Sequence, residues 1–242
     1  MTDVRFRRAM FHGINRQEMV DTFMGGQTTL AHVVLLPKEP ELAEVDSALV
    51  KYEFDPRKAA QMIEALGYSK GPDGMYRDGA AQRLAVEISA TNEDQNTKPM
   101  FATADGWQKL GVGVEPIVIP IQRQRDREYR ATFPAFTLQG GSSGLEAIKS
   151  SHGTQARLPE NSYTGSNYSR YINPEFDGLI DDYLKAILRV ERVEALRRVV
   201  NHMTDQLNMM TLYYATSSTM LSNRMRNAGR DPTWNAPEWD IS

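Results

Sequence analysis

The sequence contains no cysteine among its 242 residues. Without thiols, the chain forms no disulfide, no cysteine-ligated zinc site and no thiol nucleophile. The four histidines, His12, His32, His152 and His202, are scattered and match neither H-x₃-H nor H-E-x-x-H spacing. The sequence also has no Walker loop and no G-x-G-x-x-G fingerprint. We therefore expect no metal site and no cofactor.

Strong charge and long apolar runs are also missing. The net charge is only −3, which predicts no nucleic-acid partner. No run of about 18 apolar residues occurs, so no membrane-spanning helix is expected. Residues 1–8 include three arginines without an apolar core after them, so they do not resemble a signal peptide. The composition is that of an ordinary globular chain.

Local signals predict an α/β fold. Asp55-Pro56 and Asn173-Pro174 each combine a helix N-cap with a proline at the first helical position, and Asp3 and Asn15 are further caps. Helices are predicted near 4–11, 16–24, 56–66, 98–110, 121–130, 145–150, 174–188 and 190–209. Residues 35–50 are expected to be irregular, because Pro37 and Pro40 oppose regular pairing.

Strands are predicted where apolar residues alternate or β-branched residues gather, at 84–88, 112–119 and 135–138. The order strand, helix, strand indicates a βαβ unit. Shorter strands are expected at 75–76 and 211–214. We expect these elements to form a mixed sheet flanked by helices.

Several segments resemble family 5 solute-binding proteins, the peptide and nickel receptors of ABC importers. Val4–Val20 resembles the family pattern "vRqAl…aidReeiv". Tyr52–Tyr68 resembles "y.yDpekAk.LLaeaGy", and Asn167–Ile180 resembles "n…y.np.fD.li". The turn pair Asp73-Gly74 and Asp78-Gly79 and the segment Leu212–Tyr214 also match. These blocks keep the family's order across nearly the whole chain.

The resemblance implies a periplasmic-binding-protein-like (type II) fold, of which this chain is the C-terminal lobe only. Residues 1–215 would form that lobe, and residues 216–242 would form a tail that returns towards the N-terminal lobe. The resemblance implies that this N-terminal lobe and the export signal are both absent from this chain. The implied role is not enzymatic: the protein would capture a peptide or other polar solute outside the cytoplasm, in a periplasmic or extracellular, membrane-associated setting. It would deliver the solute to the membrane permease of an ABC importer. With half of the cleft absent, we expect the chain alone to bind weakly or not at all.

The segment after the third predicted strand is the first candidate for ligand contacts: Gln139, Gly140, Gly141, Ser142 and Ser143. Glycines allow a ligand to approach the backbone, while amide and hydroxyl groups supply hydrogen bonds. Peptide receptors of the family often carry "W.aDy" here, whose acid pairs with the peptide amine. This sequence lacks that acid, which argues against recognition of a free peptide amine; a sugar, a modified peptide or another polar solute is equally open. The alternative is an ordinary glycine-rich turn.

Two further groups are candidates for the cleft. Asn161, Tyr163, Asn167 and Tyr168 lie in a long polar loop, where a tyrosine offers a flat apolar face and a hydroxyl; the alternative is an ordinary surface loop. Arg123, Arg127 and Arg130 are spaced to share one face of a helix and could hold a carboxylate; the alternative is a solvated helix face.

A different chemistry is suggested by residues 140–144, which match the hydrolase pattern G-x-S-x-G with Ser142 as nucleophile. That mechanism needs a histidine base on the serine. Downstream of Ser142, only His152 and His202 could supply it. The serine hydrolase is kept as the alternative function, and an interaction module without a ligand is a third possibility.

Overall fold

The structure is a computed structural model that describes residues 3–134, 136–216, 222, 224–226 and 240–241. Its α-helices are α1 (Val4–His12), α2 (Arg16–Met24), α3 (Pro40–Val45), α4 (Pro56–Ala65), α5 (Asp94–Leu110), α6 (Arg127–Thr132), α7 (Leu145–Ser150), α8 (Pro174–Lys185) and α9 (Arg189–Gln206). Its strands are β1 (Ser69–Lys70), β2 (Tyr76–Arg77), β3 (Ala85–Thr91), β4 (Gly113–Ile119), β5 (Phe136–Leu138), β6 (Met225–Arg226) and β7 (Asp240–Ile241). No helix within these described ranges is both long and apolar enough to cross a membrane.

The predicted helix starts are confirmed by their capping bonds. The carboxylate of Asp55 accepts a 2.9 Å hydrogen bond from the amide of Lys58, and Pro56 occupies the first helical position of α4. Asn173 caps α8 in the same way, 3.0 Å from the amide of Phe176. Such caps satisfy amides that have no partner within their own helix, which is why these short signals locate helices reliably.

The central sheet has three strands in the order β4-β3-β5, and both pairings are parallel. Ile88 in β3 lies opposite Pro116 on one side and Phe136 on the other. The predicted strand, helix, strand unit is confirmed as β3-α5-β4, but the prediction of a mixed sheet is wrong. Each crossover returns the chain to the same end of the sheet, so the strands run in one direction. The β1–β2 and β6–β7 pairs are antiparallel and separate from this sheet.

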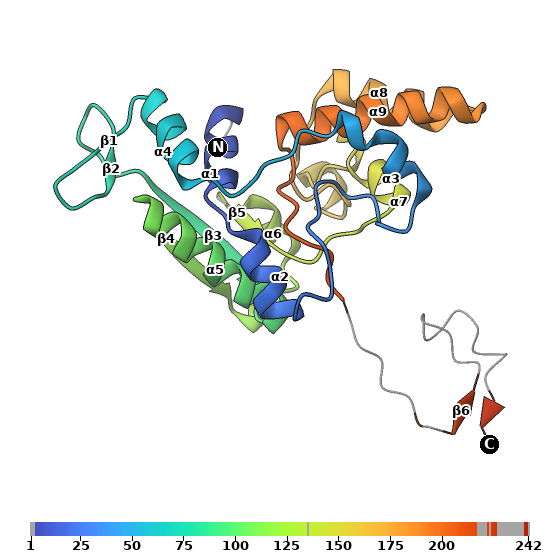
Figure 1. The fold of residues 1–242 in the computed structure, drawn as a ribbon, viewed down its shortest axis with the longest axis horizontal. Coiled ribbons are helices and arrows are strands. Elements are labelled where there is room, and N and C mark those ends of the chain that lie inside the picture. The colour runs from blue at the N-terminus through green and yellow to red at the C-terminus, as the bar shows by residue number, and fades with distance from the viewer. Residues whose placement is uncertain (1–2, 135, 217–221, 223, 227–239, 242) are drawn as a thin grey trace.

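A first hydrophobic core joins α1, α2, α4 and α5 to the sheet and lies on the left of Figure 1. At its centre the indole of Trp107 is almost fully buried and donates a 2.8 Å hydrogen bond to the carbonyl of Met10. The ring of Trp107 also packs against Phe136, with 4.8 Å between centroids. Helix α5 is thereby fixed between the sheet and α1.

A second hydrophobic core lies on the right of Figure 1 and is built by α3, α7, α8 and α9. Phe176 and Ile180 of α8 are fully buried against Val199 and Val200 of α9. The periodic apolar positions of both helices account for this pairing. The predicted lobe of residues 1–215 thus contains two centres of packing.

Arginines of the first helices connect the two cores. The guanidinium of Arg7 donates a 2.6 Å bond to the carbonyl of Gln206, and that of Arg8 a 2.9 Å bond to the carbonyl of Asp205, at the C-terminal end of α9. These carbonyls have no partner within their helix, and a cation is favourable at this end of the helix dipole. Helix α1 therefore caps the C-terminal end of α9.

Arg16 is a second connection and is only 3% exposed. Its guanidinium donates to the carbonyls of Ala31 (2.8 Å), Thr211 (3.1 Å) and Tyr52. Burial lowers the pKa of Arg16 to about 10, so the group stays charged at neutral pH. It holds three separate segments of chain together.

Three other predictions about local structure need correction. Residues 211–214 form an isolated antiparallel bridge between Tyr213 and Leu30 rather than a strand. Residues 35–50 contain α3, because Pro40 occupies a first-turn position where it suits a helix. Residues 121–130 are not one helix: a 3₁₀ turn ends at Arg123, and Asp126 then caps α6 through the amide of Tyr129. The tail from 216 onwards, with Trp234, Asn235 and Trp239, lies mostly outside the described residues.

Candidate ligand-binding site

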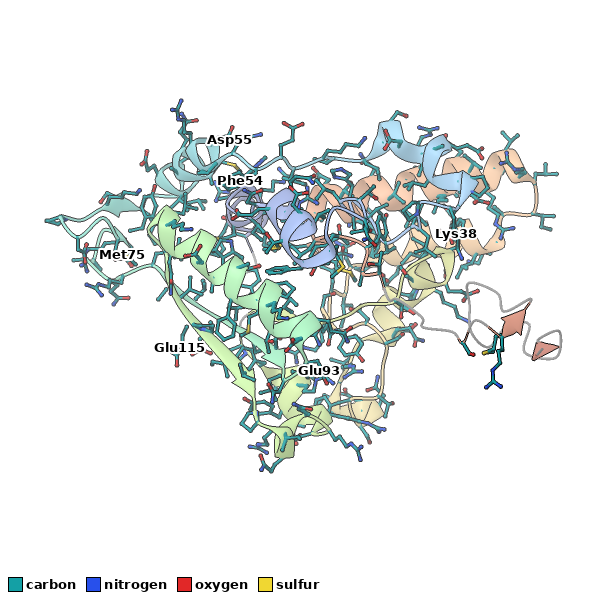
Figure 2. The ribbon with its side chains drawn as sticks, turned by 60° about the horizontal axis from the view of Figure 1, so that its bottom comes forward. Lys38, Phe54, Asp55, Met75, Glu93 and Glu115 are labelled. Atoms are coloured by element: carbon teal, nitrogen blue, oxygen red, sulfur yellow. The ribbon has the colours of Figure 1, made fainter. Side chains whose placement is uncertain are left out.

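The carboxyl ends of the three parallel strands meet at one edge of the sheet. Strands β3, β4 and β5 end at Thr91, Ile119 and Leu138. In Figure 2 this edge is marked by Glu93, at the opposite end of the sheet from the hairpin that carries Met75. In open α/β sheets this is the edge at which ligands bind, because the loops that follow the strands converge there.

The candidate segment Gln139–Ser143 leaves β5 at this edge. Its first anchor is the amide of Gly140, which donates a 3.1 Å bond to the side-chain oxygen of Asn96 in the first turn of α5. The Asn96 side chain is buried and donates in turn to the hydroxyl of Thr91 (2.9 Å) and the carboxylate of Glu93 (3.1 Å). The loop after β5 is therefore tied to the loop after β3.

The second anchor of the segment is Glu39. Its carboxylate accepts a 3.0 Å bond from the amide of Leu145, the first residue of α7, and a 2.8 Å bond from the amide of Leu36. Gly144 lies directly above Glu39 with a φ of +90°, a conformation that favours glycine, and its amide donates to the carbonyl of Val34 at 2.7 Å. Both ends of the candidate segment are thus held by buried or partly buried contacts.

Between these anchors the segment is open. Gly140, Gly141, Ser142 and Ser143 are all exposed. A Cβ atom added at Gly140 or Gly141 would meet nothing within 4 Å, and neither has a positive φ. Neither fold nor packing therefore requires glycine at these two positions. The free space leaves backbone amides and two hydroxyls available to a ligand.

Gln139 is held differently. Its side-chain oxygen accepts a 2.8 Å bond from the guanidinium of Arg130 in α6. Arg130 also lies 5.9 Å from the ring centroid of Tyr168, and Arg157 lies 3.5 Å from the same centroid. Arg130 of α6 and Gln139 of the loop after β5 thus lie together with Arg157 and Tyr168 of the long loop.

The side-chain amides of Asn161 and Asn167 form hydrogen bonds within the long loop itself. Asn161 donates to the carbonyl of Ala156 at 2.7 Å. Asn167 is 3% exposed and donates to the carbonyls of Ser151 (3.2 Å) and Tyr171 (3.0 Å). These bonds give the long loop a defined shape, because buried carbonyls need partners.

The two tyrosines of the candidate set are more accessible. The hydroxyl of Tyr163 donates to the carboxylate of Glu128 at 3.3 Å, and Tyr168 is 46% exposed. Tyr163 has a positive φ of +57°, which marks a tight bend at that point of the loop. Of the four loop residues predicted for the site, Tyr168 lies in the group around Arg130.

The shared face predicted for Arg123, Arg127 and Arg130 is wrong, because the chain breaks between Arg123 and α6. Arg123 pairs with Asp126 at 2.7 Å and lies over the ring of Tyr129. The sequence analysis selected Arg130 because of this predicted shared face, which the structure does not form. It missed Glu39, Asn96 and Arg157, whose contacts to Leu145, Gly140 and Tyr168 leave no local pattern in the sequence.

The hydrolase arrangement is not formed. Within the described part of the chain, no histidine is hydrogen-bonded to Ser142. His152 instead contacts the hydroxyl of Thr154 at 2.8 Å, and His202 the hydroxyl of Tyr171 at 3.0 Å. Without a base the serine is an ordinary hydroxyl. The residues that the structure describes also include no cluster of three or more acidic or histidine side chains able to hold a metal ion.

A parallel α/β unit with an open polar loop at its carboxyl edge is an arrangement that binds ligands. The family model for "Bacterial extracellular solute-binding proteins, family 5 Middle" matches residues 1–154. The chain therefore belongs to family 5 of the bacterial extracellular solute-binding proteins, which are binding proteins and not enzymes.

Two curated relatives agree with this assignment. The chain is 23% identical over 232 residues, 95% of its length, to heme-binding protein A of Haemophilus influenzae, covering 40% of that protein. It is 32% identical over 116 residues, 47% of its length, to a protein of Deinococcus radiodurans described as "Probable ABC transporter-binding protein", covering 19% of it. The chain spans less than half the length of these relatives.

Solved structures share the fold. NikZ from Campylobacter jejuni in complex with Ni(L-His) superimposes with a TM-score of 0.78 at 17% identity, over 98% of this chain and 48% of that one. AppA from Bacillus subtilis in complex with a nonapeptide gives a TM-score of 0.76 at 16% identity, over 99% of this chain and 48% of that one. At these identities the likeness concerns the fold alone.

Proposed function

We propose that this chain is one lobe, of the type II periplasmic-binding-protein kind, of the substrate-binding component of an ABC importer. It captures a peptide or another polar solute outside the cytoplasm and delivers it unchanged to the membrane permease. The observation that carries the proposal is the open segment 140–143, anchored at both ends at the carboxyl edge of the sheet in a chain of this family. A loop with fixed ends and a free middle is suited to ligand contact.

The second wall of the site is proposed to be an N-terminal lobe that closes over this edge. Hinge closure around a ligand is a known switching mode of such receptors, and the closed form is the one a permease would select. Because this chain spans less than half the length of its relatives, we expect weak binding by the chain alone. The protein would act in the periplasm or at the cell surface.

The proposed ligand contacts are Gln139, Gly140, Gly141, Ser142, Ser143, Asn161, Tyr163, Asn167 and Tyr168. Direct contacts are proposed for the open segment and for Tyr168, which are exposed. Asn161 and Asn167 would act by shaping the loop, since their amides already bond to backbone carbonyls. The relatives bind different solutes according to their names, among them haem, a nickel–histidine complex and a nonapeptide, so the solute of this chain is left open.

Native mass spectrometry tests this function. The protein is purified from its own host together with any flanking sequence that its gene encodes, and the retained small molecules are identified. Gly141→Trp should abolish retention by filling the open loop. Gly178→Trp in α8 is the matched control, because a Cβ there also meets nothing within 4 Å. Absence of any retained solute from the unmodified protein, or equal loss in both variants, would contradict the proposal.

A further inference from the structure

Two arginines from distant parts of the chain face the same aromatic ring. Arg130 belongs to α6, and Arg157 lies in the loop that precedes Tyr168. Their guanidinium carbons are 5.9 Å and 3.5 Å from the ring centroid of Tyr168. The electron-rich face of an aromatic ring attracts cations, so Tyr168 interacts with both guanidinium groups.

No carboxylate of a described residue forms an ion pair with either arginine. Arg130 donates to the neutral oxygens of Gln139 (2.8 Å) and Gln124 (3.4 Å), and Arg157 donates to the carbonyl of Gly165 (2.7 Å). The nearby acids have other partners: Asp126 pairs with Arg123, and Glu128 accepts from Tyr163. The pair therefore carries two positive charges without a compensating negative one.

The surroundings make this arrangement costly. The Nε of Arg130 is buried and has no hydrogen-bond partner. Burial lowers the pKa of Arg157, Tyr168 opposes that shift, and the positive charges of Arg130 and Arg127 add to it. Partly buried like charges repel each other, and a buried donor without an acceptor is rare in native structures. A negative charge close to the two guanidinium groups would reduce their mutual repulsion.

The position connects this pair to the proposed binding edge. Gln124 follows β4 and Gln139 follows β5, so Arg130 spans the ends of two strands. Gln139 also directly precedes the open segment 140–143. A solute lying along that segment would bring one end against the two guanidinium groups. Their planar forks match the two oxygens of a carboxylate.

We propose that Arg130 and Arg157, held by Tyr168 and Gln139, form a subsite for a carboxylate group of the captured solute. The inference rests on the proposed function, and it narrows the ligand class to organic acids, including peptides and other molecules with a free carboxylate. The neutral and cationic groups of the solute would lie along the glycine and serine residues of the loop.

Arginine side-chain NMR tests the subsite directly on this chain. The ¹⁵N-labelled chain is titrated with sodium succinate, with neutral succinamide and with sodium phosphate, at constant ionic strength. The Nε–Hε signals of Arg130 and Arg157 should shift and saturate with succinate and should not respond to succinamide. Arg130→Lys and Arg157→Lys keep the charge but lose the fork, and each should weaken succinate binding about tenfold.

Arg192→Lys is the matched control, because Arg192 lies 5.8 Å from the ring centroid of Tyr183 in the second core. It should leave succinate binding unchanged. Thermal unfolding and the amide spectrum establish that each variant is folded. Absence of saturation with succinate, an equal response to succinamide, or tighter binding of phosphate than of succinate would overturn the assignment.

The subsite and the receptor role fail in different ways. Saturable succinate binding by this chain, together with no solute retained by the protein from its host, would support the subsite and contradict the receptor. Retention of a solute that has no carboxylate would support the receptor and contradict the subsite.

Discussion

Gly106 of α5 packs directly on the backbone of Gly13: a Cβ atom at position 106 would lie 2.8 Å from the Gly13 carbonyl oxygen. Gly13 ends α1, three residues after the carbonyl that receives the Trp107 indole. The contact explains a glycine in the middle of a 17-residue helix, where it otherwise weakens the helix. Close approach of α1 and α5 depends on it.

Gly106→Ala should therefore destabilise the protein despite the higher helix propensity of alanine. We expect the free energy of unfolding to fall by about 1–3 kcal/mol, because the new methyl group meets backbone that cannot move aside. Gly178→Ala in α8, where the space is empty, should raise it by about 0.5–1 kcal/mol. Urea denaturation measures both, and a gain in stability from both variants would show that the contact is not tight.

Replacement of Arg16 should loosen three segments at once. Arg16→Met removes the bonds to the carbonyls of Ala31, Tyr52 and Thr211. We expect a loss of about 2–4 kcal/mol, since the carbonyls of Tyr52 and Thr211 lose the guanidinium donor, while that of Ala31 keeps only the Thr211 hydroxyl. The loss of stability in Arg16→Lys should be smaller than in Arg16→Met but not zero, because one ammonium group cannot reach all three carbonyls. The exposed Arg192→Met serves as control and should change the unfolding free energy by less than about 0.5 kcal/mol.

Lowering the pH should decrease the stability of the folded protein through protonation of His202. This histidine stacks on Phe176 with 4.8 Å between centroids and contacts the hydroxyl of Tyr171. Burial lowers the pKa of His202 below its ordinary 6.5, although the carboxylates of Glu175 and Asp205 oppose the shift. As pH falls through 6.5, the unfolded chain binds a proton that the folded histidine resists, so stability decreases.

The measurement is the thermal midpoint between about pH 7 and pH 5, a window set by the ordinary histidine pKa. The midpoint should fall as the pH is lowered, and His202→Phe should make the fall shallower. Burial also lowers the pKa values of His12 and His32, so a residual slope is expected in the variant. An NMR titration of His202 with a midpoint above 6.5 would contradict this account.

Glu39 should control the shape of the candidate loop. Glu39→Ala removes the acceptor for the amides of Leu36 and Leu145, at an expected cost of about 1–3 kcal/mol. Hydrogen exchange at Leu145 should become faster, because its amide loses its partner. Glu41→Ala, two residues away in α3, is the control. Equal exchange at Leu145 in both variants would show that Glu39 does not hold the loop.

The parts of this fold that sequence predicts are the ones encoded locally. Asp55-Pro56 and Asn173-Pro174 specify their helices within four residues, and the alternation near Ile88 specifies β3. Strand direction is not local: it depends on where α6 and β5 return the chain, and the sheet is parallel where a mixed one was expected.

In the candidate site, too, some features can be predicted from local sequence and others depend on the fold. The glycine and serine run of 140–144 is visible in the sequence as an unusual composition. Its anchors are not, because Asn96 and Glu39 lie 44 and 106 residues from the residues they hold. Arg157 and Arg130 likewise meet only through the fold.

The bonds from Arg7 and Arg8 to the end of α9 also bear on how the chain assembles during synthesis. The carbonyls they cap lie 199 and 197 residues further along the chain. Leu207 likewise completes the core that contains Met10. During synthesis α1 is therefore made well before the carbonyls that it caps, and it cannot complete these contacts until the end of α9 has left the ribosome.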